Sequence, residues 1–465
     1  MKSKLRLFTF LCLALWAACT VAAGQEAPYR ITLQDAIQKA LQANLSVLEA
    51  GTRVDEAEGT RLRRLSAALL PRVNAQTYAN YQNHDLQAQG LSFTGLPIPK
   101  VVGPLSNYDF RVYAQQNIVD LVSYRGLKAS ESAVAAGKMD ERDSRDLIVR
   151  AVAALYLNAQ SAVAHAAVAE SRVNDSTALY KLAKDKHDGG TATGVDVLRA
   201  QVQLANDRQA LLIAENQHKQ SLLELERNIG IDPGTPVELA DPLQFHPLRQ
   251  PEIEALVPAA LLARADYLSL ASQRAGLLQQ QSANHARLLP KLSLNGNFGE
   301  IGRSIGGVQR TGLIQGQIDF TLFDRDRNGE AQELQSRLQR IDDQIADLRR
   351  GIVEDLREAL LNLDSAAAQV EVARDGQQLA LRELEMAQDR FQQGTANNVE
   401  VVTAQDELAR AEDNYILAVS SHEDAKFALA RAMGDTEKNI LMLTQNQVSD
   451  CQPTTLCQGT ALSLP

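Results

Sequence analysis

The sequence contains two copies of one pattern, and this duplication constrains the fold more than any other feature. The segment Gly394–Gly434 matches the segment Gly190–Gly230 at a constant offset of 204 positions, and Asp324 follows Asp120 by the same 204 positions. The stretch between aspartate and glycine therefore has the same length in both halves. Two helices that run side by side and end together require such equal lengths. We expect one structural unit used twice, rather than two unrelated domains.

Each copy is expected to contain a helix, a hairpin of strands, a long helix, a tip turn and a returning helix. Leu-Leu-Pro occurs at 69–71 and again at 288–290, where each strand hairpin would begin. Glycine and proline then mark a longer loop in the first hairpin. The expected parts are a first repeat at 24–230 with its strand hairpin at about 71–119, a linker at 231–252, a second repeat at 253–434 with its strand hairpin at about 290–323, and a C-terminal tail at 435–465.

The helical segments have the heptad pattern of coiled coils. No proline occurs from Asp120 to His187 or from Asp324 to Gln393. A helix of such length would reach roughly 100 Å at about 1.5 Å per residue. Alanine recurs at every seventh position of the returning helix, which lets helix axes approach closely. The positions are Ala404, Ala411, Ala418, Ala425 and Ala432.

The expected strands alternate between apolar and polar residues. After Pro71, Val73, Ala75 and Thr77 share one face, and Asn74 and Gln76 share the other. The four segments of this kind fit strands with lipid on one side and water on the other. Four strands cannot close around water, and unpaired strand edges are not tolerated in lipid. Two copies would supply eight strands, and side chains would nearly fill the interior of a barrel of that size. Three copies would supply twelve strands and leave an open lumen. We therefore expect a homotrimer with a 12-stranded transmembrane β-barrel, continued by an α-helical barrel of long coiled-coil helices.

The N-terminus has the order of a secretory signal peptide, which we place at residues 1–23. Basic residues precede an apolar run, and small residues precede Gly24. Cys19 is an alternative start of the mature chain, as an acylated first residue. Removing the signal takes three positive charges from the net charge of −10 and leaves −13. Such an acidic chain is a poor nucleic-acid binder. Cys451 and Cys457 are expected to pair as a disulfide in an oxidising periplasm.

Several short motifs, two of them duplicated, carry a family resemblance. Thr32 to Ala36 precedes the first helix, Leu322-Phe323-Asp324 joins a strand to a helix, and Arg390 to Thr395 marks a helix turn. Ala263 to Tyr267 resembles the entry to a second half. With the two Leu-Leu-Pro sites, these residues resemble the TolC family of outer-membrane efflux and type I secretion proteins, from Ile31 to about Gly434. The resemblance implies a trimeric channel of the bacterial outer membrane that extends into the periplasm. It also implies a tip that docks onto a periplasmic adaptor and an inner-membrane pump of the RND, ABC or MFS type.

The two tip turns are the expected functional region. They contain Gly189, Gly190 and Thr191 in the first repeat, and Gly394, Thr395 and Ala396 in the second. Six residues after each turn glycine stands an acid, Asp196 or Glu400, where the family has aspartates near the pore constriction. Three copies of Glu400 would form a cation-selective ring. The alternative for each acid, which applies to Asp196 more than to Glu400, is a solvated carboxylate that only stabilises the helix start. The sequence departs from the family at Ala396, which replaces a basic latch residue, and at Thr403, which replaces a second acid.

We find no catalytic motif, so no enzyme activity, cofactor or metal site is expected. The seven histidines are scattered, and no nucleophile elbow, phosphate loop or dinucleotide fingerprint is present. Two other functions use long helices. A periplasmic adaptor would have one helical hairpin beside lipoyl-like sheets, and a trimeric surface protein without transport would not explain two reversals at one depth.

Overall fold

The computed structural model describes residues 29–88, 90, 99–233, 235–248 and 252–444. The expected signal segment with Cys19, and the expected disulfide partners Cys451 and Cys457, lie outside the described residues.

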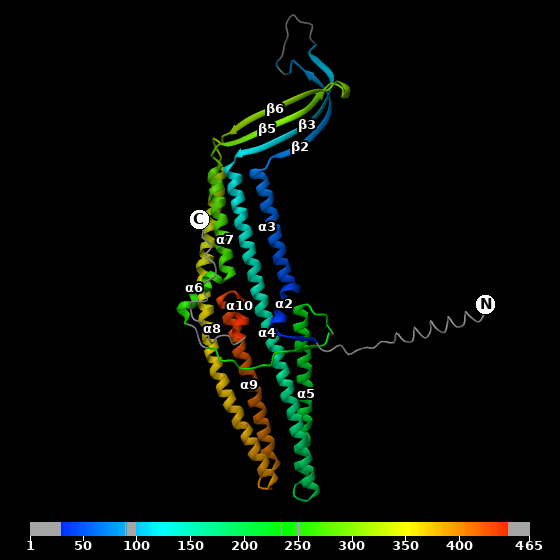
Figure 1. The fold of residues 1–465 in the computed structure, drawn as a ribbon, viewed down its shortest axis with the longest axis vertical. Coiled ribbons are helices and arrows are strands. Elements are labelled where there is room, and N and C mark those ends of the chain that lie inside the picture. The colour runs from blue at the N-terminus through cyan, green and yellow to red at the C-terminus, as the bar shows by residue number, and fades with distance from the viewer. Residues whose placement is uncertain (1–28, 89, 91–98, 234, 249–251, 445–465) are drawn as a thin grey trace, which may run out of the picture.

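The chain forms a long rod of helices with a β-sheet at one end and two helix reversals at the other (Figure 1). Two helices run the whole distance between them, α4 (Leu121–Asp188) with 68 residues and α8 (Asp326–Gln392) with 67. By length and composition α4 could cross a membrane, but here it packs along α3, α5, α7 and α9. The shorter helices of the rod are α3 (Leu45–Leu69) and α7 (Ala265–Ala286) beside the sheet, and α5 (Gly194–Ile229) and α9 (Asn398–Met433) beside the reversals.

Short elements surround the middle of the rod. They are β1 (Tyr29–Ile31), α2 (Leu33–Ala43), β4 (Val237–Leu239), α6 (Ile253–Ala263) and α10 (Thr436–Thr444). β1 and β4 pair in parallel, which ties the segment after α5 back to the N-terminal segment. Thr32 and Asp35 form a capping box at the start of α2, so this helix begins where the sequence supplies its cap.

The four longer strands form one antiparallel sheet in the order β2-β3-β5-β6. Its strands are β2 (Arg72–Asp85), β3 (Val101–Val119), β5 (Lys291–Gly302) and β6 (Gln309–Asp319). The register keeps the two faces distinct across all four strands. One row of neighbours is polar, and the next, on the opposite face, is apolar or lacks a side chain. The polar row is Arg72, Gln115, Asn295 and Gln315, and the other is Val73, Ala114, Gly296 and Ile314.

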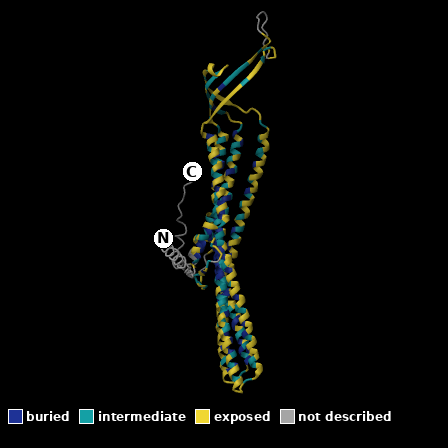
Figure 2. Ribbon diagram, turned by 90° about the vertical axis from the view of Figure 1, so that its right-hand side faces the viewer, coloured by how far each residue is buried: buried dark blue, intermediate teal, exposed yellow. Residues whose placement is uncertain are grey.

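The helices of this chain do not cover the sheet. Figure 2 shows few buried residues in the strands, and many along the middle and lower helices. Within the four strands, Asp109 and Ser293 are the buried residues, and both are polar. The helices therefore leave the apolar row uncovered, and β2 and β6 each have one strand neighbour in this sheet and one open edge.

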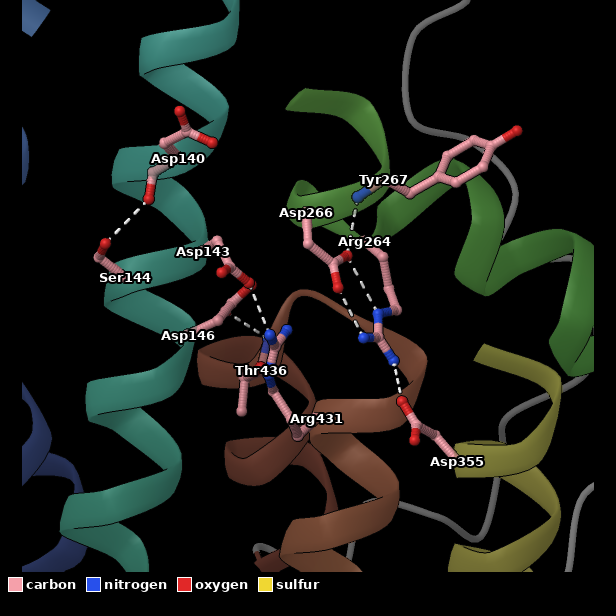
Figure 3. Close-up of polar contacts among 10 residues, drawn as sticks. All are labelled: Asp140, Asp143, Ser144, Asp146, Arg264, Asp266, Tyr267, Asp355, Arg431 and Thr436. Carbon is pink, nitrogen blue, oxygen red and sulfur yellow. Dashed lines mark hydrogen bonds and ion pairs between the residues drawn. The ribbon is translucent and has the colours of Figure 1, made fainter. Parts of the chain in front are cut away.

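A network of charged residues joins the helices at the middle of the rod (Figure 3). Buried Arg264, at the α6–α7 junction, donates to Asp266 at 2.6 Å and to Asp355 of α8 at 2.6 Å. Arg431 of α9 pairs with Asp143 of α4 at 2.6 Å. The backbone N–H of Thr436 donates to Asp146 Oδ1 at 2.9 Å. These contacts join the α6–α7 junction to α8, and α4 to α9 and to the start of α10.

Candidate functional site

The two helix reversals have the same local geometry. Gly190 and Gly394 adopt left-handed φ angles of 74° and 76°, which a residue with a side chain rarely adopts. The threonine after each glycine donates from both its N–H and its hydroxyl to one carbonyl near the end of the preceding helix. These bonds join Thr191 N and Oγ1 to Lys186 O at 2.8 and 3.0 Å, and Thr395 N and Oγ1 to Arg390 O at 2.9 and 3.1 Å. The turn motif in the sequence thus specifies its own hydrogen bonds.

The two acids after the turns are held differently. Asp196 accepts from the N–H and the hydroxyl of Thr193 at 3.0 and 2.6 Å, as the third residue of a capping box. These hydrogen bonds hold the pKa of Asp196 below its ordinary value. In the second hairpin Asn397 caps α9 by itself, and Glu400 instead forms an ion pair with Arg390 of α8. Asp196 therefore serves the helix start, whereas the Glu400 carboxylate pairs with a cation of the neighbouring helix in its hairpin.

Two contacts join the first helical hairpin (α4 and α5) to the second (α8 and α9) at the tips. Lys186 Nζ donates to the carbonyls of Phe391 and Gln392 at 2.7 and 3.0 Å, and it lies 5.0 Å from the centre of the Phe391 ring. Asn398 Nδ2 donates to the Asp196 carbonyl at 2.9 Å. A cation on the last carbonyls of α8 complements the negative end of that helix. These contacts keep the two tip turns side by side.

An apolar groove of about 380 Å³ lies between α5 and α9 just above the tips. Thr403 lines it, so this expected site residue lies in the groove and on the same helix as Glu400. The other lining residues are Val195, Leu198, Arg199, Val202, Gln203, Val399 and Val402.

A cluster of carboxylates lies farther from the tips, where α4, α5 and α9 meet. Burial raises the pKa of Asp175, Asp207 and Glu412 above the ordinary values for these residues. Repulsion between Asp175 and Asp207 adds to the rise for Asp175. Arg172 partly offsets the rise in the pKa of Asp207 and of Glu412, and its guanidinium lies 3.5 Å from Asp207. The first hairpin and α9 therefore pack across ionised groups that would be better solvated in water.

We expect the three carboxyl groups of this cluster to make the rod more stable as the pH falls through their raised pKa values. A carboxyl group with a raised folded-state pKa lowers stability once ionised, so its cost grows as pH rises from the unfolded pKa to the folded pKa and is absent below both. Asp207→Asn should therefore raise the melting temperature at about pH 7, and it should flatten the gain that comes as the pH falls through the raised pKa of Asp207 toward the ordinary carboxyl value. Circular dichroism melts would measure both. Asp347→Asn, at an exposed acid on α8, is the matched control and should leave the pH dependence unchanged.

The contacts of two tip residues were not predicted from the sequence. Lys186 and Arg390 each stand four positions before a turn glycine and 204 positions apart. That shared position was a usable signal, but the partners of the two cations depend on how the hairpins lie together. Within the described ranges, no group of three or more His, Cys, Asp or Glu residues is arranged to hold a metal ion.

A known protein family and several of its members match most of this chain. The profile of the outer membrane efflux protein family matches residues 36–231 and 256–435. The pyoverdine export outer membrane protein OpmQ of Pseudomonas aeruginosa is 23% identical over 414 residues, which cover 86% of this chain and 85% of OpmQ. The probable efflux pump outer membrane protein TtgC of Pseudomonas putida is 23% identical over 417 residues, covering 86% of this chain and 82% of TtgC.

Solved structures share the fold. The CmeC outer membrane channel of Campylobacter jejuni superposes with a TM-score of 0.73 at 17% identity, over 88% of each chain. The family profile matches both halves, and the resemblance drawn from the sequence is confirmed. The chain belongs to the outer membrane efflux protein family.

Proposed function

We propose that this chain is the outer-membrane exit duct of a tripartite efflux or type I secretion system. Three copies would form one channel, in which twelve strands close a barrel and the helices continue it as a tunnel through the periplasm. The channel would conduct substrates passively from an inner-membrane pump of the RND, ABC or MFS type. A periplasmic adaptor would contact the tip turns. The two halves of the chain act as structural repeats in this arrangement.

The observation that carries the proposal is the uncovered sheet with two open edges. An apolar face that no helix covers fits lipid, and lipid accepts a sheet only when every strand edge is paired. Further copies of the same sheet can pair β6 of one copy with β2 of the next. A soluble adaptor or surface protein would instead cover these strands with its own residues.

The helices offer a second argument for a homotrimer. Some helix positions are buried within the chain, whereas the equivalent positions in the other half, 204 residues away, are exposed. On the long helices, Leu157 of α4 is 4% exposed, whereas its counterpart 204 positions later, Leu361 of α8, is 71% exposed. On the shorter helices, Ile416 of α9 is 7% exposed, whereas its counterpart Leu212 of α5 is 67% exposed. α4 packs on α9 within the chain. By the same arrangement, α8 of one copy would pack on α5 of the next.

Native mass spectrometry of the detergent-solubilised protein tests the assembly. We expect a mass of three chains and recovery in the outer-membrane fraction after heat treatment. A mass of one chain would exclude the trimeric duct. Recovery in the soluble periplasmic fraction would favour the adaptor function instead.

The pore proposal for Glu400 is tested by ion selectivity. Glu400→Gln should lower the cation preference of channels in planar bilayers, because three carboxylates near the axis would be removed at once. Asp196→Asn should change the selectivity less and should weaken the start of α5 by about 1 kcal/mol, because its carboxylate caps that helix. An unchanged cation preference in Glu400→Gln would remove Glu400 from the pore.

A further inference from the structure

A strap without helix or strand, residues 240–248, crosses the middle of the rod between β4 and α6 (Figure 1). One end of the strap is fastened by Asp241. Tyr156 of α4 donates from its hydroxyl to Asp241 Oδ2 at 2.9 Å, and Gln160 Nε2 donates to the Asp241 carbonyl at 2.7 Å. The Leu33 N–H of α2 donates to the same carboxylate at 2.8 Å. Hydrogen bonds therefore hold this end of the strap on α4 and α2.

The other end of the strap rests on the second hairpin. Leu243 and Phe245 pack against a small apolar cluster of α8 and α9, which consists of Val370, Ala418 and Val419. The Phe245 ring centre lies 4.7 Å from that of His422 on α9, and the two ring planes are inclined by 66°. Lys426 Nζ of α9 donates to the His246 carbonyl at 3.5 Å. The strap therefore ties α4 to the α8 and α9 pair.

The strap covers a buried titratable group, His422, that the channel function does not use. His422 is 0% exposed, and neither of its ring nitrogens makes a hydrogen bond to a described residue. Glu423 Oε1, which also lacks a hydrogen bond, lies 3.5 Å from His422 Nδ1. The other carboxylate oxygen of Glu423 pairs with Lys426 at 2.7 Å, and Lys426 is also 0% exposed. While His422 is neutral, these three side chains carry one negative and one positive charge.

Protonation of His422 would upset this balance. An imidazolium would be a second buried cation beside Lys426, and both cations would compete for the single carboxylate of Glu423. The charged ring has two N–H donors, whereas the neutral ring has one. A buried charge without enough partners is costly, so the charged ring favours a state in which water reaches it. The strap is the part of the cover that can move, because α8 and α9 are continuous helices.

The other charged groups around this pocket are paired or open to solvent. Arg150 of α4 pairs with Asp424 of α9 at 2.8 Å. On the neighbouring stretch of α8, Asp364 and Glu371 are exposed. On the strap itself, His246 is half-buried. His422 is therefore the buried group whose change of charge would act on the strap.

We propose that the strap is a proton-released tie, in which protonation of His422 lifts Phe245 and His246 off α9 while Asp241 stays fastened to α4. Histidine is the side chain that changes charge between about pH 5 and pH 8. The strap is therefore closed near neutral pH and released in acid. The two hairpins then lose one link at the middle of the rod, without unfolding. The inference does not depend on the number of copies in the channel, because every residue of the latch belongs to one chain.

Tryptophan fluorescence at position 245 tests the release. The one tryptophan of the sequence, Trp16, lies in the expected signal segment, so Phe245→Trp gives the mature protein a single local reporter. Its emission should move to the red by several nanometres between about pH 8 and about pH 5, because the indole passes from a packed site into water. A local reporter is needed, because the carboxylate cluster of α4, α5 and α9 changes the stability of the whole rod with pH.

Two substitutions of His422 in the reporter protein should abolish the red shift. His422→Gln keeps a polar side chain that does not titrate, and His422→Phe fills the pocket with an apolar ring. The far-ultraviolet circular dichroism of every variant should be the same at both pH values. A loss of helix signal in acid would show general unfolding and would overturn the local release.

Two other histidines supply the matched controls. His165→Asn removes the histidine of α4 that lies 3.0 Å from Asp413, and His246→Asn removes the histidine of the strap. Both should keep the red shift of the Phe245→Trp reporter. A reporter that does not respond to acid overturns the latch. So does a shift that survives both substitutions of His422, or one that His246→Asn abolishes.

Discussion

Replacing Leu212 and Leu361 together by glutamate is expected to leave the protein as a monomer. Both side chains are largely exposed on one copy, and their counterparts Ile416 and Leu157 are buried within it. In the proposed trimer each leucine would be buried at every interface. Burying a leucine stabilises by about 1.5–3 kcal/mol. A buried, unpaired carboxylate costs several kcal/mol more. The summed free-energy cost of the two substitutions is therefore larger than the stabilisation that one helix–helix interface provides.

Native mass spectrometry in detergent measures the outcome as one chain or three. Leu262→Glu provides the control, because Leu262 is 79% exposed and lies on α6, which carries neither of the two substituted leucines. The control should remain trimeric. A trimer that survives both glutamates would show that α8 and α5 do not meet between subunits, and the packing proposed for the tunnel would have to be abandoned.

Arg264→Met should give the largest loss of stability among single substitutions in the middle network. Arg264 is buried and bonded to Asp266 and Asp355, so its removal leaves carboxylates without their donor (Figure 3). Burial pushes the pKa of Asp266 upward, but the hydrogen bonds and charge of Arg264, together with the Tyr267 N–H and the charge of Arg431, outweigh burial and hold this pKa below its ordinary value. Removing one partner of a buried ion pair typically costs about 3–5 kcal/mol.

Chemical denaturation would measure this loss as a lower midpoint with an unchanged slope. Asp266→Asn in the Arg264→Met background should recover part of the stability, because it removes one of the two stranded charges. The control, Arg350→Met, removes an arginine whose ion pair with Asp347 is exposed, and should change stability by less than about 1 kcal/mol. Equal losses from the two arginine substitutions would contradict a special role for the buried network.

Local sequence features were good guides to local structure. Thr193 and Asp196 have the spacing of a capping box, and the structure forms it at the start of α5. Gly190 and Gly394 mark the two reversals because glycine accepts the left-handed backbone there. The alternation around Val73 predicted a two-faced strand because the side-chain period of a strand is two residues.

The same reasoning could not predict contacts between segments that are far apart in the sequence. Nothing in the order of residues says that Lys186 meets Phe391, or that Asp207 of α5 lies near Glu412 of α9. Both pairs depend on how one hairpin is rotated and shifted against the other. Heptad spacing gives the faces of a helix but not which neighbour covers each face.

By itself, the sequence determined the duplication, the length of the rods, the position of the two reversals and the two-faced strands. These features arise from short-range periodicity and from backbone preferences, which each segment carries alone. The tertiary structure alone decided that Glu400 pairs with Arg390 while its counterpart Asp196 caps a helix, and that Arg264 joins three helices. Such choices depend on which charged groups burial brings within a few ångströms of each other, and that distance is set by the packing of the whole chain.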